Sequence, residues 1–396
     1  MKEKIIRHEN IIKIIAYSLL TVAYCLLTYI TVTHQIVQNS SDYGAHASII
    51  FDTWNASGVR ALFETISYPG WHLVLFALSL TGLSIPVSIG IATAIFNGLT
   101  AAIVFAAFDR HFKKYTLLLS IIAGCIVLFV TAIYLPSFNE FLYRGQGSPT
   151  IWHNPTYIAV KPAALLAILL SVSIIKKGKV KLFEGVALAI IIGFSIILKP
   201  TFFQVFFPSI VVFLIYHWIV NRDMQFIKNW FFIILPSLAF MLFQYFMLFG
   251  SSESESTIAF TFFWPWNETT PNVLISIILL LAFIIFVGII CRKEILSEKS
   301  AYVLPTIFLI VGLLEISFLT ETGYRAYHGN MGWGYSLSAF IAWFFYLELF
   351  IRKAFIEKTL KAIFIAIGTS LIVLHAASGA YFYVYLLSFS GDVGMF

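Results

Sequence analysis

The fold class is decided by residues 11–32, which read IIKIIAYSLLTVAYCLLTYITV. A run of about 20 apolar residues forms a helix long enough to cross the hydrocarbon core of a bilayer. The run lacks a small-residue cleavage site, so we expect it to stay as a span and not to be removed as a signal peptide. Comparable runs recur along the chain. The sequence therefore predicts an all-α integral membrane protein, in which residues 1–396 form a single polytopic transmembrane domain without a separate soluble domain.

The composition is that of a protein whose surface faces lipid. Hydrophobic residues make up 60% of the chain and charged residues only 11%, and the mean hydropathy is +0.91. So few charges could not cover a soluble domain of this size. The isoelectric point of about 9.0 does not indicate a nucleic-acid partner, because the basic residues lie in short loops between apolar runs. Cys25, Cys125 and Cys291 lie in or beside these runs and lack metal or disulfide spacing.

The distribution of Lys and Arg predicts the topology. If the N-terminus is cytoplasmic, all but five of the 25 Lys and Arg fall in cytoplasmic segments, and such a bias fixes the orientation of a membrane protein. The exceptions are Arg60, Arg144, Lys161, Lys199 and Arg325. We expect about 11 transmembrane helices and a C-terminus on the outside. They are predicted near residues 11–33, 86–108, 116–135, 155–175, 184–199, 201–220, 229–249, 273–291, 301–319, 333–351 and 362–387.

The first outer loop, residues 34–85, is predicted to hold juxtamembrane and re-entrant helices. Residues 69–82 are apolar but too short to cross, and if they did cross, every later Lys-rich loop would face outward. We therefore expect a re-entrant or interfacial helix there. Earlier in the loop, Tyr43, Ala47 and Ile50 repeat near helical spacing, which predicts a surface helix with one face in the lipid.

This loop resembles the first extracytoplasmic loop of the GT-C membrane glycosyltransferases. In that family an acidic residue follows the first span, juxtamembrane helices come next, and a Tyr-Pro-Pro-Leu-like element follows. The matching stretches are Asp42-Tyr43, Gly58 and Tyr68-Pro69-Gly70-Trp71-His72-Leu73, before a span that ends at Arg110 and Lys114. Gly70 stands where the family element has its second proline. The resemblance covers roughly residues 11–115.

The resemblance implies that Asp42 is the catalytic carboxylate. It would position and deprotonate an acceptor hydroxyl while that hydroxyl attacks the anomeric carbon of a sugar carried on polyprenyl phosphate. Asp52 is the second candidate carboxylate, or else a solvated surface residue. His46, four residues after Asp42, would orient Asp42, bind phosphate or simply lie at the interface. The alternative for Asp42 is a helix N-cap after two serines.

Cationic groups would stabilise the phosphate that leaves. Arg325 is the main candidate for this clamp, because its guanidinium can grip a phosphate bidentately and stays charged. The alternative is an ion pair with Glu321 that orders the loop. Lys161 and Lys199 could join Arg325 around a phosphate, or each could snorkel to the outer headgroups. The candidate substrate- and phosphate-binding residues are Arg325, His328, Glu321, Lys161, Lys199, Arg144, His153 and His72.

Two features keep more than one interpretation. Residues 264–267, Trp-Pro-Trp-Asn, form an aromatic surface that suits stacking on a sugar ring but also suits an interfacial aromatic belt. Asp42, Asp52 and His46 could supply ligands to a divalent metal ion, but their spacing is not diagnostic, so metal dependence stays open.

Together the patterns predict a plasma-membrane glycosyltransferase with its active site on the extracytoplasmic face. Its partners would be a polyprenyl-phosphate-linked sugar, a glycan, lipid or protein acceptor of the cell envelope, and the bilayer. An oligosaccharide-repeat polymerase or ligase is the first alternative, disfavoured because the longest outer segment is the first one. A transporter or lipid flippase is the second, disfavoured because the sequence shows no inverted repeat and its polar residues gather toward one face.

Overall fold

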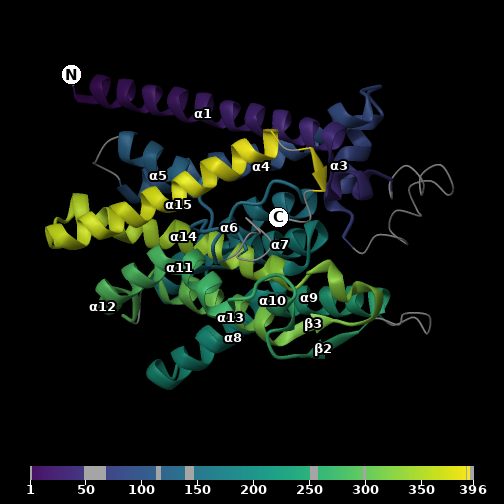
Figure 1. Ribbon diagram of the computed structural model, residues 1–396. Coiled ribbons are helices and arrows are strands. Elements are labelled where there is room, and N and C mark those ends of the chain that lie inside the picture. The colour runs from purple at the N-terminus through teal and green to yellow at the C-terminus, as the bar shows by residue number, and fades with distance from the viewer. Residues whose placement is uncertain are drawn as a thin grey trace.

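The computed structural model describes residues 2–48, 68–112, 117–138, 147–249, 257–297, 300–388 and 390–392. Helices account for most of this part of the chain (Figure 1). They are α1 (Lys2–Gln38), α3 (Gly70–Ser79), α4 (Ile85–Phe112), α5 (Leu117–Phe129), α6 (Pro155–Lys177), α7 (Leu182–Leu198), α8 (Thr201–Asn221), α9 (Met224–Phe249), α10 (Trp264–Asn267), α11 (Val273–Ile290), α12 (Arg292–Ile295), α13 (Val303–Phe318), α14 (Gly332–Ile351) and α15 (Ala362–Ser388). A 3-10 helix, η1 (Gly323–His328), and a π-helical turn, η2 (Arg352–Ile356), complete the helical set.

Two short strand pairs accompany the helices. The strand β1 (Asn39–Ser40) pairs in parallel with β4 (Gly391–Asp392), and β2 (Ile258–Phe260) pairs antiparallel with β3 (Leu319–Glu321). The prediction of a helical membrane protein is confirmed, and the strands add only local pairings to it. No strand was expected because two or three residues are too few to show an alternating pattern.

Seven helices of the described chain are long and apolar enough to cross a membrane: α1, α4, α6, α8, α9, α11 and α15. Three of the shorter apolar helices, α5, α7 and α13, coincide with other predicted spans. Helix α14 is buried along nearly its whole length, so it forms the centre of the bundle. The buried side chains of the described helices join into one hydrophobic core around it.

The helices run between two ends of the molecule. One end holds a large cavity lined from segments around residues 42–46, 153–154, 199, 264–269 and 320–336, and we call it the cavity end. The other is marked by the ion pairs Lys13–Asp109, Lys177–Glu184 and Lys353–Glu294, and we call it the opposite end. In Figure 1 the N-terminus and α12 lie on one side, and α3, β2 and β3 on the other.

Helices α1 and α15 run in the same direction. Their C-terminal ends are joined by the parallel pairing of β1 with β4, and Tyr383 donates a hydrogen bond to the carbonyl of Leu27 at 3.3 Å. Both helices are apolar enough to cross a membrane. If both cross, the chain between them must cross an odd number of times, so the total number of crossings is odd.

The predicted span at 116–135 ends early, because α5 stops at Phe129. Gly379 of α15 packs so closely there that an added Cβ would lie 1.8 Å from the Phe129 carbonyl oxygen. Beyond it, His375 Nδ1 is 2.7 Å from the Thr131 carbonyl oxygen, and Ser378 Oγ accepts from the Tyr134 amide at 3.0 Å. Non-helical backbone inside a membrane protein needs such partners, which α15 provides.

The described parts of the predicted first outer loop, residues 34–48 and 68–85, differ from the prediction in one respect. Residues 42–48 are helical as expected, but Tyr43 and Ala47 are buried in protein and do not face lipid. The Tyr43 hydroxyl donates to the Trp152 carbonyl at 2.7 Å, which ties this helix to the segment before α6. Residues 69–82 form α3 as predicted, with its first turn packed on the end of α7.

Candidate active site

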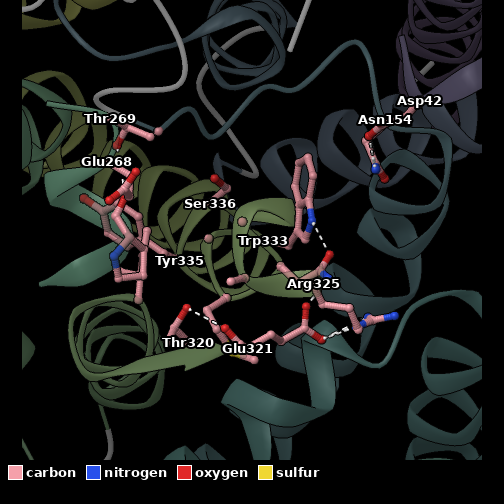
Figure 2. A pocket seen from close by; sticks show the side chains of 18 of the residues that line it. Asp42, Asn154, Glu268, Thr269, Thr320, Glu321, Arg325, Trp333, Tyr335 and Ser336 are labelled. Atoms are coloured by element: carbon pink, nitrogen blue, oxygen red, sulfur yellow. Dashed lines mark hydrogen bonds and ion pairs between the residues drawn. The ribbon is translucent and has the colours of Figure 1, made fainter. Parts of the chain in front are cut away.

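The cavity has a volume of about 600 Å³ and is lined by segments far apart in the sequence. Figure 2 shows Asp42 and Asn154 at one end of it and Glu268 and Thr269 at the other, with Trp333 between them. The structure brings six of the predicted site residues to this cavity: Asp42, His46, His153, Lys199, Glu321 and Arg325. The resemblance concerned only the first part of the chain, so their convergence with the later residues is new information.

Asp42 is held by the residue that caps α6. Asn154 is the N-cap, and its Oδ1 accepts from the Tyr157 amide at 2.8 Å. Its Nδ2 donates to Asp42 Oδ2 at 2.6 Å (Figure 2). Asp42 itself is the first helical residue of its segment. Its carboxylate is therefore fixed at the cavity by an amide whose own orientation is fixed by a helix terminus.

Lys199 reaches the other side of the same amide. It lies in the turn between α7 and α8 and is only 4% exposed. Its ammonium donates to Thr156 Oγ1 at 3.0 Å and to Asn154 Oδ1 at 3.4 Å, and it lies 4.8 Å from the Trp333 ring centroid. Within the described part of the chain, no carboxylate lies at ion-pair distance from it. Burial lowers the pKa of Lys199 to about 8, although the charges of Asp42 and Glu321 act in the opposite direction.

A second polar chain starts at the end of β3. Glu321, which is 5% exposed, accepts from Arg325 through Nη2 at 2.9 Å and Nε at 3.0 Å. Its other oxygen accepts from Asn330 Nδ2, and Asn330 Oδ1 accepts from Trp333 Nε1 at 3.3 Å. The predicted Arg325–Glu321 ion pair is thus present. It orders a loop that bends at Gly323 and Gly329, both at positive φ.

His46 and His72 form a buried pair beside the cavity. Nδ1 of His46 lies 3.0 Å from Nε2 of His72, so one nitrogen donates and the other accepts. His72 does not line the cavity and reaches it only through His46. Burial lowers the pKa of both rings, that of His46 well below its ordinary range and that of His72 to about 4. The pair is therefore neutral at physiological pH.

The remaining predicted residues lie elsewhere. Lys161 does not reach the cavity; it is 1% exposed within α6, and its ammonium lies 4.2 Å from the Phe340 ring centroid, which also rules out snorkelling in this conformation. Asp52 and Arg144 lie outside the described residues, as does the side chain of His328. Among the residues that are described, no group of three His, Cys, Asp or Glu is placed to hold a metal ion.

Sequence reasoning missed several lining residues. Asn154 carries a recognisable signal, because Asn before Pro is a typical helix N-cap with Pro at the first helical position. Asn330 and Trp333 lie close to Glu321 and Arg325 in the sequence but were given no role. Glu268 carried no signal, since an acidic residue near an aromatic segment is ordinary in a loop between spans. Comparisons with protein-family models and with curated proteins find no match to this chain.

Proposed function

We propose that this protein is a membrane glycosyltransferase of the GT-C type. It would move a sugar from a polyprenyl-phosphate carrier to an acceptor in the cell envelope. The observation that carries the proposal is that a carboxylate, Asp42, and a buried cation, Lys199, meet across Asn154 at one cavity, and that no acid among the described residues lies at ion-pair distance from Lys199. Glycosyl transfer from a lipid phosphate needs a base for the acceptor and a cation for the leaving phosphate.

Asp42 takes the role of general base. Asn154 holds Oδ2, so Oδ1 is the oxygen that would receive the acceptor's proton. As the proton leaves, the acceptor oxygen bonds to the anomeric carbon, and the bond from that carbon to the phosphate oxygen breaks. The electron pair of that bond departs with the phosphate. Fixing the carboxylate in this way supplies the orientation that proton transfer requires.

Lys199 takes precedence over Arg325 as the phosphate ligand. Arg325 is already paired with Glu321, so a phosphate would have to compete with that carboxylate. Within the described residues, the hydrogen-bond acceptors of Lys199 are neutral, and the carboxylates of Asp42 and Glu321 act on it only from a longer distance. An anion that reaches it would gain a strong interaction, because the surroundings are poorly solvated. Arg325 would then add charge from the loop that closes the cavity.

The proposed topology has eleven crossings, with the cavity on the outside of the plasma membrane. Besides the seven long apolar helices, α5, α7, α13 and α14 run between the same two ends, so they would complete the set. The parallel α1 and α15 require an odd number, which eleven satisfies. The Lys- and Arg-rich turns at the opposite end support a cytoplasmic location for that end.

The test compares surface glycans by mass spectrometry in a strain that lacks the gene, complemented with different variants. Asp42→Asn is expected to lower transfer by about 10² to 10⁴-fold, the usual contribution of a general base. Asp109→Asn is the matched control, because Asp109 pairs with Lys13 at the opposite end.

Three results are informative. Loss of one sugar substituent in the deletion and in Asp42→Asn, with Asp109→Asn active, supports the transferase and names its product. Collapse of long chains to single repeats would indicate the polymerase instead. A glycan profile unchanged by the deletion would contradict both and favour transport.

A further inference from the structure

A second cavity lies between α8 and α9, away from the candidate active site. It has a volume of about 540 Å³, and every residue that lines it is apolar. The α8 side consists of Phe207, Val211, Leu214, Ile215 and Trp218, and the α9 side of Met224, Ile227, Phe231, Ile234, Leu235 and Leu238. Each set repeats every three or four residues, so each is one continuous stripe along its helix. We call this space the α8–α9 groove.

The two stripes face each other across the groove, and each helix also packs on another helix. Phe202 of α8 packs on Phe308 of α13, with ring centroids 5.7 Å apart. Gly185 of α7 lies against Ile233 of α9. A short turn, Arg222 and Asp223, joins the helices at the opposite end. The apolar space between them would lose dispersion contacts if it were empty, and water does not favour such a lining.

The dimensions of the groove fit one lipid chain. From Phe207 to Trp218 the α8 stripe is about 17 Å long at a rise of 1.5 Å per residue. One leaflet provides roughly half of the 30 Å hydrocarbon core, a similar length. Val211, Ile215 and Phe231 are partly exposed, so the groove is open along its side to the surroundings. Both helices are apolar enough to lie in a membrane.

Charge at the mouth of the groove determines which lipid fits. The guanidinium of Arg222 lies 4.8 Å from the ring centroid of Trp218, which itself lines the groove. Lys228 follows Ile227, a lining residue, in the first turns of α9. The intervening acid, Asp223, accepts from the Phe226 amide at 3.0 Å and so caps α9. Two cations therefore flank the mouth, beside one carboxylate that is engaged with the helix terminus.

We propose that the α8–α9 groove binds an anionic phospholipid, with one acyl chain between the stripes and the phosphate at Arg222. Basic residues between transmembrane helices are suited to such headgroups. The site is independent of glycosyl transfer, since it shares no lining residue with the active-site cavity.

The proposal that an acyl chain binds between the stripes is tested by filling the groove with a larger side chain. Purified protein is incubated with dioleoyl phosphatidylglycerol, and the lipid retained is counted by native mass spectrometry. Leu235→Trp, which adds bulk inside the groove, is expected to abolish retention of the bound lipid. Leu242→Trp is the matched control, because Leu242 lies on the same helix, is also exposed and does not line the groove. Equal retention by the two variants would overturn the proposal.

The proposal that the lipid phosphate binds at Arg222 is tested with Arg222→Gln. One cation near an anionic headgroup contributes about 1 kcal/mol, so the variant should bind phosphatidylglycerol about fivefold more weakly. Arg292→Gln, a change of an exposed cation at the same end, should bind as the unaltered protein does. Phosphatidylcholine should be retained less than phosphatidylglycerol by the unaltered protein. Equal retention of both lipids would overturn the assignment to an anionic lipid.

One further outcome would assign the groove to a different occupant. If Leu235→Trp converts a dimer to a monomer in light scattering while lipid retention stays the same, a second copy of the chain covers the groove and the lipid proposal is wrong. Size-exclusion profiles of both tryptophan variants confirm that the comparison is made between folded proteins.

Discussion

Two lysines, one at each end of the molecule, have opposite surroundings. At the opposite end, Lys353 lies between two acids, 2.7 Å from Glu294 and 3.0 Å from Glu357. At the cavity end, Lys199 is buried among a hydroxyl, an amide and two aromatic rings. Hydrogen bonding to Glu294 raises the pKa of Lys353, whereas burial lowers that of Lys199 to about 8. The same residue type is thus favoured as a cation in one place and disfavoured in the other.

The difference separates structural charges from charges available to a ligand. Lys353 is neutralised by Glu294 and Glu357 and needs no further partner. A buried ammonium without a carboxylate destabilises the fold, and such residues in membrane proteins commonly mark a functional site. This is why the proposed phosphate ligand is Lys199. The predictions below test whether the two ends differ in this way.

The largest effect is expected from replacing each lysine by methionine. Lys199→Met should lower transfer by about 10² to 10³-fold, as loss of a group that stabilises developing charge does. Its melting temperature should not fall, because the variant removes a buried charge without removing an ion pair. Lys353→Met should keep full transfer and lose stability, because Glu294 and Glu357 lose a half-buried cationic partner. Equal losses of transfer in both variants would contradict the assignment.

The pH dependence of transfer should reflect the protonation of Lys199. Transfer should fall as the pH rises through about 8, where Lys199 loses its proton. Lys199→Arg should move this fall to higher pH, because arginine stays charged. The stability of the ligand-free protein should change with pH in the opposite direction. Between about 8 and the ordinary value of 10.5 the unfolded state binds more protons, so the stability contributed by this group rises with pH. A profile identical in the Arg variant would exclude Lys199 as its source.

Much of the fold could be predicted because its signals are local. Apolar length and the Lys and Arg bias need no knowledge of distant contacts, and helices lie at the predicted runs. The end of α5 could not be predicted, because it depends on Gly379, 250 positions further along the chain. The buried face of Tyr43 was also missed, because its partner is the carbonyl of Trp152, 109 residues away.

The site was predictable in its charges and not in their arrangement. Asp42, Lys199 and Arg325 stand out because charge is rare in this chain away from its Lys- and Arg-rich segments. Asn154 connects Asp42, 112 residues before it, with Lys199, 45 residues after it. Sequence shows the cap but not these partners. Lys161 is buried as well, but its ammonium lies against the Phe340 ring and not at the cavity, which its depth in the predicted span could not show.

A smaller effect on transfer is expected at the Arg325–Glu321 pair. Glu321→Gln should lower transfer several-fold and reduce stability by about 1 to 3 kcal/mol, because a partly buried guanidinium loses its anion and the loop to Asn330 loses order. Rates and melting temperatures of Glu321→Gln and Glu357→Gln should be compared, since Glu357 pairs with Arg352 at the opposite end. If transfer falls only in Glu321→Gln, the two ends of the molecule differ in function as proposed. An equal fall in both variants would contradict that difference.

The smallest effect on transfer should come from two tyrosines, one at each end of the molecule. Like the two lysines, they differ in whether their polar group has a partner. The Tyr302 hydroxyl donates to Glu348 at 2.5 Å and accepts from Arg352 at 2.9 Å. Tyr302→Phe should leave transfer unchanged and lower stability by about 1 to 3 kcal/mol, because two charged groups lose a partner. The Tyr335 hydroxyl at the cavity end is buried and has no hydrogen-bond partner within the described residues. Removing it leaves no group unsatisfied, so Tyr335→Phe should melt at an unchanged temperature. If the two variants lose equal stability in thermal unfolding, the polar groups of the cavity end are satisfied within the fold after all.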